Sequence, residues 1–125
     1  MFLRRLSGFG AAVFAIAQAA AASERDLASG ERVFRNQCMG CHSIEQGRNR
    51  AGPTLHGLFG RVSGTLVGFN FSEPMREAAI EWDQETLDAF LADPETLVPG
   101  TRMVFWGLRP DDRRRVVAYL KAVAE

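Results

Sequence analysis

Two cysteines and a histidine form the segment of this chain with the clearest chemical potential. They lie in Cys38-Met39-Gly40-Cys41-His42, where two residues separate the cysteines and the histidine follows directly. This C-x-x-C-H spacing is typical of the attachment site of a c-type haem. Each thiol can add to one vinyl group of the porphyrin, and the adjacent imidazole can then reach the iron. The pattern predicts one covalently attached haem c, held by Cys38 and Cys41, with His42 as an axial iron ligand.

Three other kinds of site use the same residue types. A redox-active C-x-x-C pair is expected between a strand and a helix, whereas this pair follows a predicted helix. A zinc site would also need His56, but the adjacent Cys41 and His42 cannot easily ligate one tetrahedral metal. A disulfide between the cysteines would close a very small ring. Haem attachment is therefore the favoured interpretation.

The second axial ligand has to come from elsewhere, and four residues are candidates: Met39, His56, Met75 and Met103. Met39 lies inside the attachment segment and is expected to point away from the iron. His56 is expected at the surface or in a turn. Met103 follows the helix-breaking pair Pro99-Gly100, in a loop that can fold back over a haem face. Met103 is the predicted ligand, with Met75 as the alternative; a methionine in such a loop could also simply fill the core.

The elements that must position these residues are short helices and long loops. Helices are predicted over about 26–37, about 72–79, 83–92 and from Pro110 onward, and six glycines with Pro53 mark 47–68 as loops and turns. No convincing alternating strand is found. We therefore expect an all-α fold, with about four short helices and long loops wrapped around one haem that supplies much of the core.

Composition restricts the class of protein. The 125 residues carry 15 basic and 15 acidic side chains, so the formal net charge is zero, and 46% of them are hydrophobic. This size indicates one domain, and the ordinary apolar content argues against disorder. Without a clustered excess of basic charge, nucleic acid is not an expected partner. Two cysteines also cannot make a disulfide-dense scaffold.

The first 22 residues have the layout of a secretory signal peptide. A short basic start with Arg4 and Arg5 precedes an apolar stretch that ends in small residues at Ala22. We predict cleavage near Ala22, a single mature domain over 23–125 with a formal charge of −2, and a periplasmic location. An uncleaved membrane anchor is the alternative.

The mature chain resembles the class I cytochromes c, of the mitochondrial type and its close bacterial relatives. The resemblance is carried by the C-x-x-C-H motif and by segments that follow one another in order: Gly30 with Phe34, Gly52-Pro53-Thr54-Leu55-His56-Gly57-Leu58-Phe59-Gly60-Arg61, Trp82, Pro99-Gly100-Thr101-Arg102-Met103-Val104-Phe105 and Ala118-Tyr119-Leu120. It implies the cytochrome c fold, with Gly30 and Phe34 crossing the last helix near Tyr119.

The resemblance also implies roles for individual site residues. His42 and Met103 would be the axial ligands, and the Pro53 carbonyl would accept a hydrogen bond from the far ring nitrogen of His42. Arg61 and Trp82 would lie near a haem propionate. Thr101 would help to close the loop that carries Met103.

The chain departs from the family inside the pocket. Phe71 and Phe90 stand where the mitochondrial type has tyrosines, and Met75 stands where it has an asparagine. The missing hydrogen bonds are worth about 1 kcal/mol each. Axial ligands tune haem potentials over about 0.8 V, so a positive reduction potential is still expected.

A second departure concerns the surface. Three positions of the family's lysine ring are occupied by Gln37, Glu95 and Thr96, and Lys121 is the only lysine in the sequence. Although Arg50 and Arg102 remain basic, electrostatic steering of partners should be weak. We also expect Arg113, Arg114 and Arg115 to form a solvated helix face. Trp106 is expected to cap the pocket, with a partner contact as the alternative.

Together these features predict a soluble, monomeric one-electron carrier and not an enzyme. With both axial positions filled, the iron offers no vacancy for a small-molecule substrate. The expected partners are respiratory or dehydrogenase-type redox proteins, including membrane-bound complexes. The alternatives are a haem protein with a labile sixth ligand, acting as a peroxidase or gas-binding protein, and a dedicated electron-transfer subunit of one enzyme complex.

Overall fold

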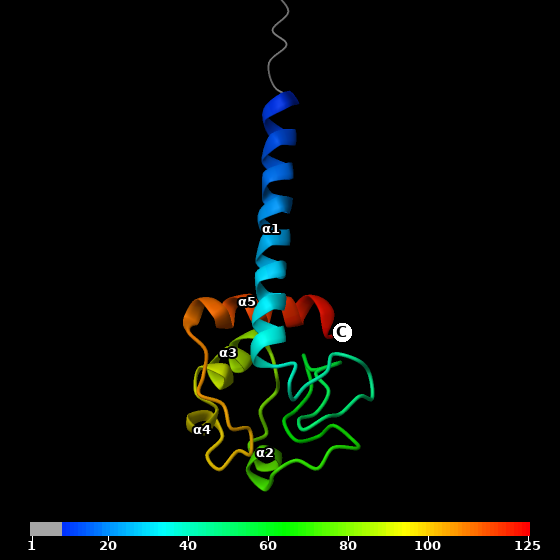
Figure 1. Ribbon diagram of the computed structural model, residues 1–125, viewed down its shortest axis with the longest axis vertical. Helices are drawn as coiled ribbons and strands as arrows, with labels where there is room; N and C mark the ends of the chain where they lie inside the picture. The colour runs from blue at the N-terminus through cyan, green and yellow to red at the C-terminus, as the bar shows by residue number, and fades with distance from the viewer. Residues whose placement is uncertain (1–8) are drawn as a thin grey trace, which may run out of the picture.

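The computed structural model describes residues 9–125 of the chain and contains five helices in that range (Figure 1). They are α1 (Phe9–Gln37), α2 (Glu73–Glu77), α3 (Gln84–Ala92), α4 (Pro94–Leu97) and α5 (Pro110–Val123). Extended pairing over the described residues is limited to an isolated antiparallel bridge between Val62 and Glu81. The predicted all-α fold is therefore confirmed.

Helices α1 and α5 cross at the top of the domain, above the loops (Figure 1). The crossing is tight because Gly30 on α1 faces the backbone of Arg115, and a Cβ atom at position 30 would lie 2.7 Å from the Cβ of Tyr119. Beside it the rings of Phe34 and Tyr119 pack with centroids 5.7 Å apart. The expected crossing of the first and last helices is confirmed, and it explains a glycine inside a helix, where it costs about 1 kcal/mol relative to alanine.

Helix α1 is much longer than the predicted segment 26–37. It spans 29 residues and extends beyond the crossing as a single rod (Figure 1). Its alanine-rich first half has high intrinsic helix propensity, so nothing in that segment ends the helix. The predicted signal peptide, residues 1–22, falls partly on 1–8, which lie outside the described residues. No helix among the described residues is both long and apolar enough to cross a membrane.

The short helices are fixed at their starts by side-chain caps. Ser72 accepts a hydrogen bond from the Met75 amide at 3.3 Å, and Asp83 accepts one from the Thr86 amide at 2.8 Å. Helix α4 was not predicted, because the preceding helix was expected to end at Ala92 and proline does not continue a helix. With Asp93 as its N-cap, a proline in the first turn starts a helix just as well. The chain between α3 and the Met103 loop is thereby ordered.

Aromatic and aliphatic side chains from α1, α3 and α5 form the core beside these loops. Trp82 and Phe90 pack with ring centroids 5.2 Å apart, and Val116 is fully buried. The expectation that Arg113 is solvated is wrong. Its side chain is 17% exposed and donates to Asp88 on α3 at 3.0 Å and to the Leu108 carbonyl at 2.7 Å. The ion pair with Asp88 connects α5 to α3, and the hydrogen bond to Leu108 connects α5 to the chain that follows the Met103 loop.

Candidate functional site

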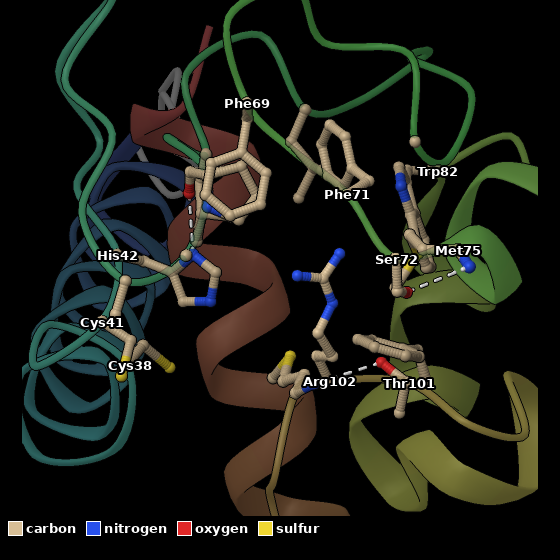
Figure 2. Close-up of a pocket in the computed structure, with 18 of the residues that line it drawn as sticks. Cys38, Cys41, His42, Phe69, Phe71, Ser72, Met75, Trp82, Thr101 and Arg102 are labelled. Carbon is tan, nitrogen blue, oxygen red and sulfur yellow. Dashed lines mark hydrogen bonds between the residues drawn. The ribbon is translucent and has the colours of Figure 1, made fainter.

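A cavity of about 420 Å³ opens between the attachment segment and the loops that follow it. Figure 2 shows Cys38, Cys41 and His42 on one side of it and the Thr101–Arg102 segment on another. Its walls are mainly apolar and aromatic, and Met103 lines it together with His42. Cavities of 300–1,000 Å³ with such walls are typical of cofactor sites.

The imidazole of His42 is held in one orientation. Its Nδ1 lies 2.7 Å from the carbonyl oxygen of Pro53, a distance at which a protonated Nδ1 donates to that oxygen and leaves Nε2 free as a metal ligand. Gly52 packs against the ring so closely that a Cβ there would lie 2.7 Å from Nδ1. Burial lowers the pKa of His42, and the bond to Pro53 only partly opposes this. The neutral imidazole needed for ligation is therefore favoured.

The two thiols lie next to this ring and are both free. Cys38 is buried at the end of α1, and burial, with Cys41 as a smaller cause, raises the pKa of its thiol to about 11. Cys41 is exposed. The backbone amides of Cys41 and His42 both donate to the Cys38 carbonyl, at 3.1 and 2.9 Å. This tight turn brings both sulfur atoms and the imidazole to one side of the cavity.

Met103 approaches from a loop without regular structure. Its amide donates to the Thr101 hydroxyl at 3.3 Å, a local contact within the loop. Met75, on α2, also lines the cavity, whereas Met39 and His56 do not. Over residues 9–125 no group of three or more His, Cys, Asp or Glu side chains could hold a metal ion, so the zinc arrangement with His56 is not formed. The geometry leaves Met103 and Met75 as candidates for the second ligand.

Arg61 and Trp82 also line the cavity and adjoin each other, since the Trp82 amide donates to the Arg61 carbonyl at 2.9 Å. The Arg61 guanidinium donates to the carbonyls of Thr54 and His56, both at 3.1 Å. Burial lowers the pKa of this group. A half-buried guanidinium is a suitable partner for a carboxylate such as a haem propionate.

Several residues that line the cavity were not predicted from the sequence. Phe71, Phe90 and Met75 were expected at the pocket and line it, but so do Asn70, Ser72 and Arg102. Arg102 donates to the Asn70 carbonyl at 3.3 Å and so links the Met103 loop to the chain segment before α2. Arg102 directly precedes the candidate ligand Met103 in the sequence, and this position could have indicated that it lines the cavity.

The expectation that Trp106 caps the pocket is wrong. Its side chain is 98% exposed and it does not line the main cavity. Together with Met103 and Glu95 it instead lines a second hollow of about 390 Å³. Val104, between Met103 and Trp106, is 88% exposed. Met103 and Val104 line both hollows, whereas Trp106 lines only the second one, and both Val104 and Trp106 are strongly exposed.

Comparison with known proteins decides what this arrangement is. Residues 27–124 match the family model for cytochrome c. The chain belongs to the cytochrome c family. It is 49% identical over 87 residues to cytochrome c2 iso-2 of Magnetospirillum molischianum, covering 69% of this chain and 90% of that relative. It is 44% identical over 115 residues to cytochrome c2 of Blastochloris viridis, covering 90% and 89%, and 48% identical over 98 residues to cytochrome c of Chlamydomonas reinhardtii, covering 77% and 88%.

Membership settles the cofactor and the class of activity. As a cytochrome c, the chain carries one covalently bound haem c with its iron, and it is a monohaem electron carrier with redox proteins as partners. The residues present fit this group: two free thiols, an imidazole whose Nδ1 is already hydrogen-bonded, two thioether sulfurs and a half-buried guanidinium line one mainly apolar cavity.

Proposed function

We propose that this cytochrome c transfers single electrons with its iron ligated by His42 and Met103. The observation that carries the proposal is that these two residues line one cavity although 60 residues of chain separate them, while the Pro53 carbonyl commits the His42 ring to one orientation. Cys38 and Cys41 would form the two thioethers. The proposed roles of Arg61 and Trp82 are to hold a propionate, and that of Thr101 is to shape the loop.

When bound, the haem supplies reversible exchange between ferrous and ferric iron. The chain's own residues set how readily this occurs. The thioether of Met103 favours the ferrous state, and the apolar walls, which include Phe71 and Phe90, disfavour the extra positive charge of the ferric state. Both effects raise the reduction potential, so we expect it to be positive.

Spectroelectrochemical titration tests this function. We expect a reversible one-electron couple with a positive midpoint potential, and a ferrous protein that binds carbon monoxide slowly because Met103 fills the sixth position. Rapid carbon monoxide binding at neutral pH would contradict the proposal and favour a peroxidase or gas-binding protein.

We propose that partners make contact largely through the apolar pair Val104 and Trp106. Both are strongly exposed on the loop that carries Met103, and exposed tryptophans are common anchors of interfaces. Nearby charges of both signs, Arg102 against Glu95, give no strong single-sign field. Partners are redox proteins of the respiratory or dehydrogenase type, and the cytochrome acts as a free, monomeric carrier.

Oxidation of the reduced protein by bacterial membranes that contain a cytochrome oxidase tests this contact. We expect Trp106→Ala to lower the second-order rate by about fivefold or more. Val67→Ala is the control, because Val67 is 94% exposed but lines neither cavity. The rate should depend only weakly on ionic strength. A steep fall with added salt, or equal rates for the two variants, would contradict the proposal.

We further propose that the protein is exported and works in the periplasm after cleavage near Ala22. The support is the basic start, the apolar stretch and the small residues before Ser23. Mass spectrometry of the purified protein should give a mature chain that begins near Ser23. A haem-loaded chain that retains residues 1–22 would instead support a membrane anchor.

A further inference from the structure

The turn that precedes Met103 has an unusual partner for its central amide. Residues 98–101 form a turn in which the Thr101 amide donates to the Val98 carbonyl at 3.0 Å. Gly100 has φ +81°, the value of the third residue of a type II turn, and Pro99 occupies the favoured second position. The hydrogen bond of such a turn leaves the Gly100 amide unused.

Glu95 supplies the acceptor for that amide. Its Oε1 accepts a hydrogen bond from the Gly100 N–H at 2.9 Å. A hydrogen bond to a carboxylate is stronger than one to a neutral oxygen. From the sequence, Glu95 could be interpreted only as a position where a lysine of the family's ring is absent.

The helix that carries Glu95 is held in place by buried neighbours and by an N-cap. Glu95 lies on α4, next to Pro94, which is fully buried, and ahead of Val98, which is 2% exposed. Asp93 accepts hydrogen bonds from the Thr96 amide and hydroxyl, at 3.2 and 2.7 Å, and so fixes the start of this helix. The Glu95 carboxylate therefore connects a capped helix beside the core to the loop that carries Met103.

Met103 lies two residues after Thr101, the last residue of this turn. Gly100 also lies against α2, where a Cβ would approach Cγ of Pro74 to 3.2 Å. Further along, the Met103 amide donates to the Thr101 hydroxyl. These contacts fix the backbone between Val98 and Met103. The Glu95 contact is the hydrogen bond that a side chain from outside the loop supplies.

We propose that Glu95 is a positioning residue that stabilises ligation of the iron by Met103, by holding the Gly100 amide and hence the loop in its closed form. This inference rests on the proposed ligation by Met103. Loss of the carboxylate should increase the fraction of molecules in which the loop is open and the thioether is detached.

Competition by imidazole for the sixth position of the ferric holoprotein measures that fraction. Its apparent affinity rises in proportion to the population of the open form. The titration follows loss of the weak far-red absorption band of the sulfur–iron bond. We expect Glu95→Ala to lower the apparent imidazole Kd about fivefold, which corresponds to about 1 kcal/mol.

Two further variants separate the hydrogen bond from other effects. Glu95→Gln removes the charge but keeps an acceptor oxygen, so it should recover most of the wild-type affinity. Glu85→Ala removes an equally charged, exposed glutamate from the first turn of α3 and should leave the Kd unchanged. Equal Kd values for Glu95→Ala and Glu85→Ala would overturn the inference, as would a Glu95→Gln variant that behaves like Glu95→Ala. A wild-type protein without the far-red band would instead contradict ligation by Met103.

Discussion

The side of the cavity that carries His42 and the side that carries Met103 are held by different kinds of contact. His42 belongs to a tight turn with Cys38 and Cys41, and its ring is fixed by Pro53 and packed on Gly52. The Met103 loop depends on contacts from remote parts of the chain. One proposed ligand is thus specified by a few neighbouring residues, whereas the other is specified by the whole fold.

This difference has a consequence for stability of the site. Covalent attachment and close packing leave the His42 side few alternative arrangements. The Met103 side is held by single hydrogen bonds at the surface, such as Arg102 to the Asn70 carbonyl at 3.3 Å. Such bonds are worth about 0.5–1.5 kcal/mol each. Opening of the site should therefore begin on the Met103 side.

Breaking the attachment segment should have the largest effect. Replacement of both Cys38 and Cys41 by alanine should abolish covalently held haem, since no other thiol exists in the sequence. Haem staining after denaturing electrophoresis measures this directly. Met39→Ala is the control, because Met39 lies within the same motif but is 45% exposed and lies outside the cavity. Covalent haem in the double variant would refute the attachment site.

A smaller effect is expected where the imidazole packs on the backbone. A Cβ introduced by Gly52→Ala would collide with the His42 ring, whereas a Cβ at Gly40 would meet nothing within 4 Å. We expect Gly52→Ala to destabilise the holoprotein by about 1–3 kcal/mol, the usual cost of overpacking. Gly40→Ala should have little effect. Chemical unfolding of the two ferric variants checks this, and equal stabilities would show that the His42 side is less tightly packed than described.

The smallest effect concerns the cap of α4 on the Met103 side. Hydrogen bonds from the Thr96 hydroxyl and amide hold the pKa of Asp93 below its ordinary value. Because the folded-state pKa is depressed, the stabilising contribution is present above the unfolded-state pKa and is lost as the pH falls through the folded-state pKa, below about 4. Asp93→Asn keeps a cap but removes this titration. Its stability should therefore fall less than that of the wild type on acidification.

Asp83→Asn sharpens the comparison, because Asp83 caps α3 in the same way and hydrogen bonds from Thr86 also lower its pKa. Both variants should show the flatter acid dependence in thermal unfolding between about pH 6 and about pH 3. Acid loss of the far-red band should change in Asp93→Asn alone. If Asp83→Asn changed it equally, α4 would have no special connection to the Met103 loop.

Much of the His42 side could be predicted from the sequence, because its chemistry lies in consecutive residues. The roles of Met103 and Thr101 followed from family resemblance and from helix-breaking residues. The contacts of Glu95, Arg102 and Arg113 could not be predicted, since each joins a charged side chain to a distant or irregular backbone. Patterns of surface charge indicate solvation by default. The exposure of Trp106 was not predicted either, because a large apolar side chain is expected in the protein interior.

The optical spectrum of the ferric protein and two methionine variants tests the central claim most directly. The two sides of the cavity meet at the iron only if Met103 supplies the second ligand, although Met75 lines the same cavity. We predict that the far-red band of the sulfur–iron bond is present in the wild type, persists in Met75→Ala and is absent from Met103→Ala. A band that survives in Met103→Ala and disappears in Met75→Ala would contradict this account.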